Sequence, residues 1–436
     1  MNRILLRGAR VITMAPGRPD AERIDILVDG DRIAVTGENL DAPDAETVDF
    51  TGRVILPGLV NTHLHTWQTA LRSVGADWTL LEYLTHLHGN AVQHYEPDDM
   101  YVSNLAGALN QINCGTTTLG DWCHNSLTPE HADAAVDGLM QAGIRAVFLH
   151  GTPYRDPDLP HPLAEIDRLL NGPVRDHDLL TLGMAVQGPQ YSSPHTAVAD
   201  FRAAHERGLV ASFHQSGGAL ARGWEAVRNA GLFGPSTNVV HGSDLPDAWV
   251  KKLVRVGVTF TCTPENELGQ GHGTPVTGTL LRHGAAPSLG TDVDSVVPGH
   301  ILTAARLALA HQRSLDHAHR QRTGSHANTP TVTAKQALAW ATVEGAKALG
   351  LADQVGRIAP GMQADLVAID TRAVNLWPAH NPIAAALHAD IANIEAVMIA
   401  GRWRKRDHAL LDCDLDTVKE RLLAAGERLL HAMGAV

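Results

Sequence analysis

The chain has 436 residues, of which 44% are hydrophobic and 19% charged, and its formal net charge is −12. This length allows a large core with a satellite domain, and the acidic balance excludes nucleic acid and an anionic membrane surface as partners. Four scattered cysteines without a C-x-x-C pair, no 18-residue apolar stretch and arginines at positions 3, 7 and 10 favour a cytoplasmic protein without disulfides, membrane span or signal peptide.

Both ends of the chain alternate apolar and polar residues in short segments. Residues 1–53 contain "RILLRGARVITM" and "DILVDGDRIAVTG", the second with a D-G turn, which predict hairpin strands. Residues 357–410 repeat this strand-like pattern with Gly/Pro turns. We expect both ends to form one composite β domain, and residues 411–436 to end the chain in an amphipathic helix.

Between these ends, eight short apolar runs alternate with stretches of helical spacing. Continuous apolar runs of this length are typical of parallel strands that are covered on both faces. The pattern predicts the α/β class and a (β/α)₈ TIM-type barrel over residues 54–356. The runs are "RVILPGLV" (53–60), "TTTLGDW" (116–122), "RAVFLH" (145–150), "LLTLGMAV" (179–186), "LVASFH" (209–214), "NVVH" (238–241), "VTFTCT" (258–263) and "APSLGTD" (286–292).

A His-x-His pair can hold a metal ion, and the chain has three. Catalytic side chains of such barrels lie at the C-terminal ends of the strands. Only His63 and His65 follow an apolar run, and alternation in an extended chain points both the same way. His86 and His88 follow a helical stretch, where residues two apart diverge, so we interpret them as polar groups around a helix.

Three more residues with metal-binding side chains end predicted strands. His214 ends "ASFH", His241 ends "NVVH" and Asp292 ends "SLGTD". Together with the first His-x-His pair, they place five candidate groups at four strand ends. This joint pattern predicts a metal site at the barrel mouth.

These strand ends belong to motifs that extend through nearly the whole chain and resemble the amidohydrolase superfamily. Within it, they are similar to the cytosine-deaminase-like branch with chlorohydrolases, guanine deaminases and adenosyl-type deaminases. The resemblance implies one metal held by His63, His65, His214 and Asp292, a contact of His241 with the metal-bound water or substrate, and a homo-oligomer. The motifs are "GARVITM", "LPGLVNTHLHTWQTALR", "CGTTTLGDW", "HGSDL", "SLGTDVDS", "ALAWATVEGAKALGL" and "GRIAPGMQADLVAID".

This set of ligands suits a hydrolytic metal. Zinc accepts neutral imidazole and carboxylate and keeps a position for water, whose pKa it lowers toward about 7. Iron, cobalt or manganese also tolerate three nitrogens and one oxygen, so zinc is the default among them. Asp292 can accept the proton of that water, and His241 can orient the hydroxide or stabilise charge on the attacked group.

A second metal would need a bridging carboxylate or carbamylated lysine after the fourth strand. No lysine occurs before Lys251, and no acidic residue lies between Asp178 and Asp200. We therefore expect one divalent metal ion per chain.

The sequence departs from deaminases of this branch after the fifth strand, where they carry His-x-x-Glu. Gly217 stands where the proton-shuttling glutamate would be. Three explanations remain open. Glu265 or Glu267 replaces it as the acid, the leaving group needs little protonation, or the metal hydroxide and Asp292 suffice. We assign Glu265, with His241 and Asp292, to the catalytic group.

Several polar and aromatic residues follow the first, second and fourth strands and are candidates for substrate contact. They are Trp67, Gln68, Trp78, Trp122, His124, Gln187 and Tyr191. No phosphate-binding glycine loop or basic cluster follows a strand, which favours a small, neutral heterocyclic or amide-like substrate.

The sequence thus predicts a mononuclear metal-dependent hydrolase that attacks an amino, amide or carbamate C–N bond of a small compound with metal-bound hydroxide. Removal of a halide or thiolate, or a metal-dependent lyase, are the alternatives because of Gly217. No G-x-S-x-G motif supports a serine hydrolase. A non-enzymatic member of the superfamily is disfavoured because all five candidate positions are filled.

Overall fold

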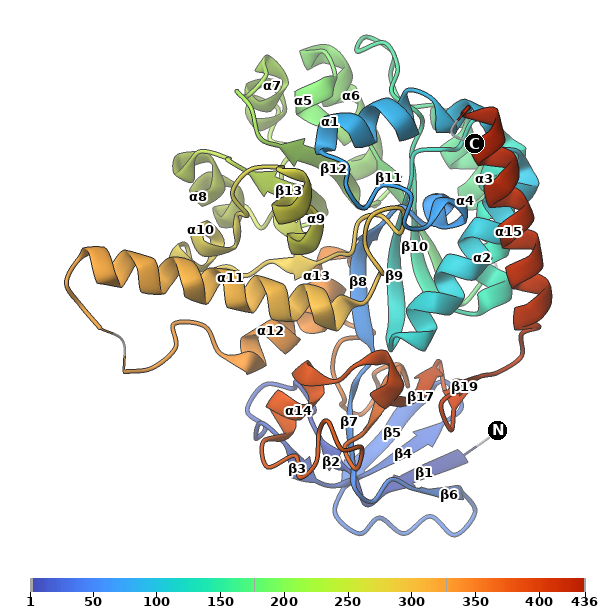
Figure 1. Cartoon of the computed structure of the whole chain (residues 1–436), viewed down its shortest axis with the longest axis vertical. Coiled ribbons are helices and arrows are strands. Elements are labelled where there is room, and N and C mark those ends of the chain that lie inside the picture. The colour runs from blue at the N-terminus through green and yellow to red at the C-terminus, as the bar shows by residue number, and fades with distance from the viewer. Residues whose placement is uncertain (1–2, 176, 327, 435–436) are drawn as a thin grey trace.

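A computed structural model describes residues 3–175, 177–326 and 328–434 (Figure 1). The chain folds into a barrel with surrounding helices, and two further sheets lie below it in the view of Figure 1. The expected α/β barrel with β structure from both chain ends is confirmed. In the described part of the chain, no helix combines the length and apolar character needed to cross a membrane.

Eight parallel strands form the barrel in sequence order. Between the first and last strands, Leu64 bridges to Asp292, and the backbone N–H of His65 donates to the carbonyl of Asp292 at 2.7 Å. The sheet therefore curves back on itself, and the C-terminal strand ends meet around one mouth. The strands are β8 (Leu59–Leu64), β9 (Thr116–Cys123), β10 (Arg145–His150), β11 (Leu180–Ala185), β12 (Ala211–Ser216), β13 (Thr237–Ser243), β14 (Thr259–Cys262) and β15 (Ser288–Leu289).

Helices follow the barrel strands and cover them, as their apolar faces require. The main ones are α2 (Pro97–Asn113), α3 (Pro129–Ala142), α4 (Leu163–Asn171), α6 (Pro194–Glu206), α7 (Arg222–Asn229), α8 (Asp247–Arg255), α10 (Thr277–Arg282), α11 (Ile301–Arg322), α12 (Ala334–Trp340) and α13 (Val343–Ala348). Short helical segments lie near the mouth: η1 (Thr66–Leu71), α1 (Leu80–Tyr83), η2 (Leu84–His88), η3 (Ala91–His94), α5 (Gly188–Tyr191) and α9 (Pro264–Gln270).

The first predicted strand is two strands in the structure. The run "RVILPGLV" divides at Gly58, so that β7 (Arg53–Pro57) pairs with β16 and β2, whereas β8 enters the barrel. The expected start of the barrel at residue 54 falls inside β7. The chain thus passes between the two parts of the molecule within one apolar segment, which explains why composition does not mark the change.

The two chain ends are interleaved in the remaining sheets. One sheet has the order β5-β4-β1-β6, and the other has the order β19-β18-β17-β16-β7-β2-β3, in which strands from both ends are neighbours. The strands are β1 (Arg3–Arg7), β2 (Arg10–Val11), β3 (Glu22–Arg23), β4 (Asp25–Asp29), β5 (Arg32–Gly37), β6 (Glu46–Asp49), β16 (Leu366–Asp370), β17 (Ile394–Ile399), β18 (Arg402–Arg406) and β19 (Ala409–Leu410). An apolar cluster that includes Ile26, Ile55 and Met398 forms their common core.

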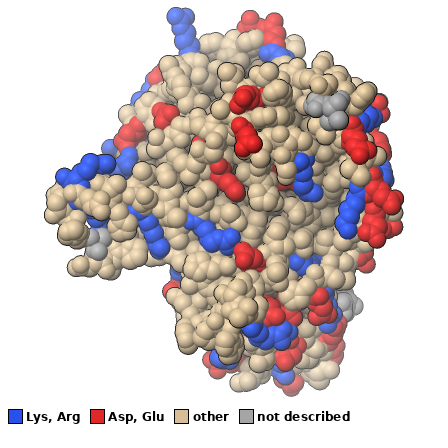
Figure 2. All heavy atoms as spheres, viewed as in Figure 1, with Lys and Arg blue, Asp and Glu red and all other residues tan. Residues whose placement is uncertain are grey.

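The final helices complete the molecule. α14 (Pro382–His388) and η4 (Ile391–Asn393) precede β17, and α15 (Leu415–Ala432) contacts α2 on the outside of the barrel (Figure 1). The predicted terminal segment 411–436 includes residues 435–436, which lie outside the described residues. On the face seen in Figure 2, acidic and basic side chains are interspersed.

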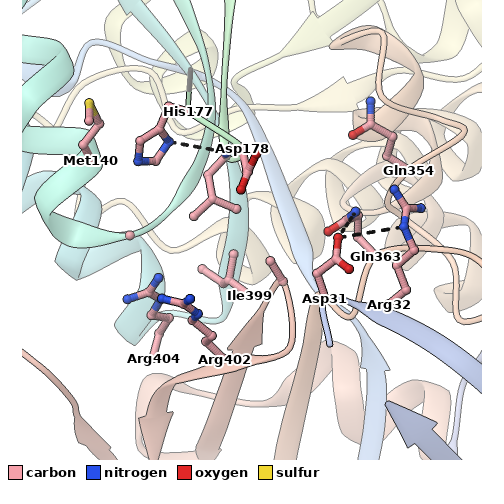
Figure 3. A pocket seen from close by; sticks show the side chains of 13 residues that line it. Asp31, Arg32, Met140, His177, Asp178, Gln354, Gln363, Ile399, Arg402 and Arg404 are labelled. Atoms are coloured by element: carbon pink, nitrogen blue, oxygen red, sulfur yellow. Dashed lines mark hydrogen bonds and ion pairs between the residues drawn. The ribbon is translucent and has the colours of Figure 1, made fainter. Parts of the chain in front are cut away.

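A cleft of about 840 Å³ separates part of the barrel from the end sheets (Figure 3). Its walls carry His177 and Asp178 from the segment before β11, and Arg402 and Arg404 from β18. Beside the cleft, Arg145 of β10 donates to Asp365 at 2.8 and 3.1 Å and to Gln363 at 2.9 Å. This buried ion pair joins the barrel to the end sheets. None of the five predicted metal-site residues lines the cleft.

Candidate metal centre

The five residues predicted for the metal site meet at the mouth of the barrel. His63 lies in β8 with His65 directly after it, His214 lies in β12, His241 lies in β13, and Asp292 follows β15. All except His214 are fully buried, and His214 is half-buried. Strand ends that are far apart in the sequence thus converge on one point.

The ring nitrogens and the carboxylate have the spacing of metal ligands. Asp292 Oδ1 lies 3.2 Å from His63 Nε2 and 3.4 Å from His65 Nε2, and His214 Nε2 lies 3.3 Å from His63 Nε2. Ligand atoms about 2.0–2.1 Å from a tetrahedral zinc ion lie about 3.3 Å from one another. His63, His65 and Asp292 therefore fit one small divalent cation, and His214 lies beside them with its ligand atom within 4.8 Å of those of His63 and His241.

The protonation of these side chains also suits a cation. Burial lowers the pKa of His63, despite the opposing effect of Asp292, and burial together with neighbouring histidines places the pKa values of His65 and His214 well below the usual range. Neutral rings keep a lone pair for a metal. The Nδ1–H of His65 donates to the carbonyl of Trp122 at 2.7 Å, which leaves Nε2 as the free ligand atom.

Asp292 remains ionised in this environment. Burial would raise its pKa, but the hydrogen bond with His63 and the charge of His241 hold the pKa well below the usual range. Its second oxygen, Oδ2, accepts hydrogen bonds from Asn266 Nδ2 at 3.0 Å and from Thr263 Oγ1 at 3.4 Å. One carboxylate can thus offer Oδ1 as a metal ligand and Oδ2 as a proton acceptor.

The backbone is strained at two of these positions. His241 and Asp292 have φ values of 65° and 67°, in the left-handed region that non-glycine residues seldom adopt. Such conformations concentrate at functional sites because the surrounding structure must hold them. Gly290 is required nearby, since a Cβ there would lie 2.7 Å from both the Cβ and the carbonyl oxygen of His63.

His241 is held by residues from α9 and the residue before it. Its Nδ1 lies 3.1 Å from Thr263 Oγ1 and 3.3 Å from Glu267 Oε1, while its Nε2 lies 4.0 Å from Asp292 Oδ2. Burial lowers the pKa of His241, but the hydrogen bond to Glu267 and the charges of Asp292 and Glu267 outweigh this effect and raise it. The ring therefore has one nitrogen anchored and the other facing the metal cluster.

The structure distinguishes the two glutamates that the sequence offered as replacements for the missing acid. Glu267 is fully buried and contacts His241. Glu265, the residue assigned to catalysis from the sequence, is half-buried and does not line the cavity at the mouth. Residues two apart on a helix point about 200° apart, so only one of the pair can face inward.

Gly217 occupies a turn with φ +68°, and no acidic side chain replaces it within the described lining of the cavity apart from Asp292. The backbone carbonyl of His272 and the carboxylate of Asp244 lie beside Gly217, 3.4 and 3.5 Å from where a Cβ would stand. The ring of His272 lies nearby, with its Nδ1 3.4 Å from Ser216 Oγ. The ring of His272 packs against that of His241 at 4.6 Å. Burial lowers the pKa of His272 to about 3.

A cavity of about 40 Å³ lies directly against the cluster. Of the seven predicted substrate contacts, His124 and Tyr191 line it, whereas the other five do not. Trp67 donates to His124, Gln68 donates to Tyr83, and Trp122 Nε1 donates to Ser212, so these three support the walls from behind. Trp78 stacks on His86 at 4.8 Å, and Gln187 donates to the carbonyl of Arg155. The full lining is His65, Leu80, Tyr83, Leu84, His88, His124, Tyr154, Tyr191, His214, Ser216, His241, His272 and Asp292.

The interpretation of His88 as a polar group around a helix was wrong. The segment Leu84–His88 is one π-helical turn, and its last residue folds over the mouth, where its ring lies 4.3 Å from that of His124. Tyr154 and His272 were also missed. All three come from loops or short turns, whose course the strand-end rule does not predict, although the second H-x-H includes His88.

Comparison with known proteins agrees with this geometry. The amidohydrolase family profile matches residues 54–404. A 5-methylthioadenosine/S-adenosylhomocysteine deaminase of Pelotomaculum thermopropionicum and a 5'-deoxyadenosine deaminase of Methanothermobacter thermautotrophicus are each 28% identical, with 98% of both chains covered.

Solved structures share the fold. Atrazine chlorohydrolase TrzN from Arthrobacter aurescens TC1, complexed with zinc, matches with a TM-score of 0.85 at 21% identity, covering 97% of this chain and all of that one. An adenosine deaminase from Xanthomonas campestris with bound zinc matches with a TM-score of 0.84 at 22% identity, covering 98% of each chain. The chain therefore belongs to the amidohydrolase family, which confirms the predicted class of metal-dependent hydrolase acting on C–N bonds.

Proposed function

We propose that this protein is an aminohydrolase that uses a single divalent metal, by default zinc, to remove an amino group from a small heteroaromatic compound. The observation that carries the proposal is a cluster in which neutral His63 and His65 lie 3.2 and 3.4 Å from ionised Asp292, and neutral His214 lies 3.3 Å from His63. Their Nε2 atoms and Oδ1 of Asp292 would hold the ion. We expect no second ion at the mouth, because both metal-compatible groups of described residues there include His63.

When bound, the cation supplies a Lewis acid that makes hydroxide available near neutral pH. Asp292 is placed to receive the proton of the attacking water at Oδ2. Asn266 and Thr263 donate to the same oxygen and keep it oriented toward the cavity. A carboxylate that can later return this proton to the departing amine performs acid and base roles in turn.

His241 would act at the reacting carbon. Because Glu267 and Thr263 anchor its Nδ1, its Nε2 is directed toward Asp292 and the metal cluster. A proton held at Nε2 stabilises negative charge that develops on the attacked group. Glu267 keeps the ring in this orientation, and we assign it a positioning role that Glu265 cannot fill.

The size of the cavity bears on the substrate. Pockets that hold drug-sized ligands usually measure about 300–1,000 Å³, far more than the 40 Å³ at this mouth. A single aminated ring is therefore the best match for the cavity as it stands. The relatives' action on adenosine derivatives extends to this chain only if the segment Leu80–His88 and Tyr154 move aside.

Removal of a halide or another good leaving group is the second candidate. It is favoured by Gly217, because Asp292 is the only carboxylic acid among the described residues that line the cavity, and the nearby Asp244 does not line it. A leaving group that departs as an anion does not need a proton from a second acid.

The two candidates are separated by product analysis with zinc-loaded protein. The panel comprises adenine, cytosine, melamine, 5'-deoxyadenosine, 5'-methylthioadenosine and atrazine. Ammonia release from one or more amines supports the proposal. Chloride release from atrazine without ammonia from any amine would establish the second candidate, and no reaction with any compound would contradict both.

A further inference from the structure

We propose that His124 presents a fixed Nε2–H donor to the cavity, and that the substrate therefore carries a hydrogen-bond acceptor, a ring nitrogen or a carbonyl oxygen, near the reacting carbon. This deepens the proposed function, on which it rests for the location of the reaction. His124 is not one of the proposed metal ligands, and the hydrogen bonds of its two ring nitrogens determine where its proton lies.

Trp67 determines which nitrogen of His124 carries the proton. The indole Nε1 of Trp67 lies 3.1 Å from Nδ1 of His124. An indole N–H can only donate, so Nδ1 must be the acceptor, and the proton of the neutral ring must reside on Nε2. Trp67 is fully buried, and Tyr95 packs edge-on against it at 5.0 Å, which keeps the donor in place.

The remaining nitrogen of His124 faces the cavity. Its Nε2 has no hydrogen-bond partner among the described residues, and its side chain lines the cavity. The ring stacks on His65 at 4.2 Å with a 20° interplanar angle, and it is nearly parallel to His214 at 6.1 Å. A donor so placed lies beside the proposed metal ligands, where the scissile bond must be.

Side chains behind and beside His124 hold its ring in place. His88 packs against His124 at 4.3 Å, and its Nε2 lies 3.2 Å from the hydroxyl of Tyr83. Gln68 donates to the same hydroxyl at 2.7 Å and accepts from Ser295 at 2.8 Å. His124 is thus held from behind and from one side, and an approaching ligand finds the donor already oriented.

The electrostatic setting favours an acceptor over a second donor. Because Nδ1 accepts from the indole of Trp67, the ring carries a single proton and is not a cation that would attract an anion. In a desolvated cavity, a neutral N–H strengthens the binding of a ligand that places a lone pair opposite it. It weakens the binding of a ligand that places a C–H or N–H there. A heteroaromatic amine with a ring nitrogen beside the amino-bearing carbon meets this requirement.

The first test measures the tautomer without substrate. Long-range ¹H–¹⁵N correlation spectra of the zinc-loaded protein, with His124 identified by its loss in His124→Phe, should show protonated Nε2 and unprotonated Nδ1. Trp67→Phe removes only the indole donor and should shift His124 toward a mixture of tautomers. Tyr95→Phe is the matched control, because it retains the packing against Trp67 and should leave the His124 signals unchanged.

The second test uses ligand analogues in which one ring nitrogen becomes C–H. With adenine and its 1-deaza, 3-deaza and 7-deaza analogues, one replacement should raise KM, or the Kd of a non-reacting ligand, by about tenfold to a hundredfold. That discrimination should decrease in Trp67→Phe, because only part of the His124 rings then carry the proton on Nε2.

Protonated Nδ1 in the wild type, unchanged His124 signals in Trp67→Phe, or equal behaviour of all the analogues would each overturn the inference. Failure of the proposed function is recognised separately. In that case, the tautomer signature persists while zinc content or ammonia release is absent.

Discussion

Glu267 and Glu265 lie two residues apart on α9 but meet different surroundings. Only Glu267 contacts His241, with its Oε1 also accepting the backbone N–H of Thr263 at 2.8 Å. Replacement by glutamine keeps the shape and removes the charge. We expect Glu267→Gln to lower kcat by about tenfold to a hundredfold, as for other residues that orient functional side chains, with zinc content unchanged.

Glu265→Gln is the matched control and should retain kcat near that of the wild type. Steady-state kinetics on the best substrate of the panel, with metal content measured on the same samples, checks both variants. A larger loss in Glu265→Gln than in Glu267→Gln would contradict the assignment of the positioning role.

Single residues were predictable from the sequence where a strand fixed them. His63, His65, His214, His241 and Asp292 all follow from the rule that barrel strands end at the mouth. The walls of the cavity were not predictable in the same way. His88 and His272 lie on a π-turn and a loop, where local pattern does not determine the direction of a side chain.

At the scale of elements, the closure between β15 and β8 shapes the metal site. β15 has only two residues, and Gly290 follows it within van der Waals distance of His63. Gly290→Ala should therefore push these segments apart, lowering both Tm and zinc content. Gly234→Ala, where a Cβ meets nothing within 4 Å, is the control. Thermal denaturation and elemental analysis check both, and an unaltered zinc content in Gly290→Ala would contradict this account of closure.

Helix α6 carries a buried carboxylate whose ionisation opposes folding. Burial raises the pKa of Asp200 from 3.8 to about 6. A raised carboxyl pKa means that the folded state binds the proton more tightly, so its contribution to stability is lost as pH rises from about 4 to 6. By linkage this loss is up to about 3 kcal/mol above pH 6.

Asp200→Asn preserves the Oδ1 acceptor used by the backbone N–H of His161 and removes the charge. We expect the variant to be more stable than the wild type, with a gain that is larger at pH 8 than at pH 5. Chemical denaturation at the two pH values checks this. A gain that does not grow with pH would show that Asp200 is not the titrating group.

The elements themselves were mostly predictable, and the exceptions have a physical cause. Eight apolar runs gave eight barrel strands, because fully buried parallel strands need continuous apolar sequence. The division at Gly58 was not visible, since the start of β8 continues the apolar run of β7 and the two strands differ in their pairing partners. The local sequence of a strand does not reveal which distant strand it pairs with.

For the molecule as a whole, the Arg145–Asp365 pair is a main connection between the barrel and the end sheets. Both side chains are nearly inaccessible to solvent. Loss of one member leaves an uncompensated buried charge, so Asp365→Asn should lower the free energy of unfolding by about 3–5 kcal/mol. Glu46→Gln, which breaks an exposed pair with Arg406, should have no measurable effect. Equal stability of the two variants in denaturant would contradict this role.

The central claim is that four side chains hold one metal ion at the barrel mouth. The decisive measurement is metal content per chain by elemental mass spectrometry, on protein purified without chelator. It includes His214→Ala and His272→Ala, whose replaced rings both line the cavity. The account predicts a value near one for the wild type and His272→Ala, and near zero for His214→Ala. A value near two, or a wild-type value near zero that added zinc does not raise, would contradict it.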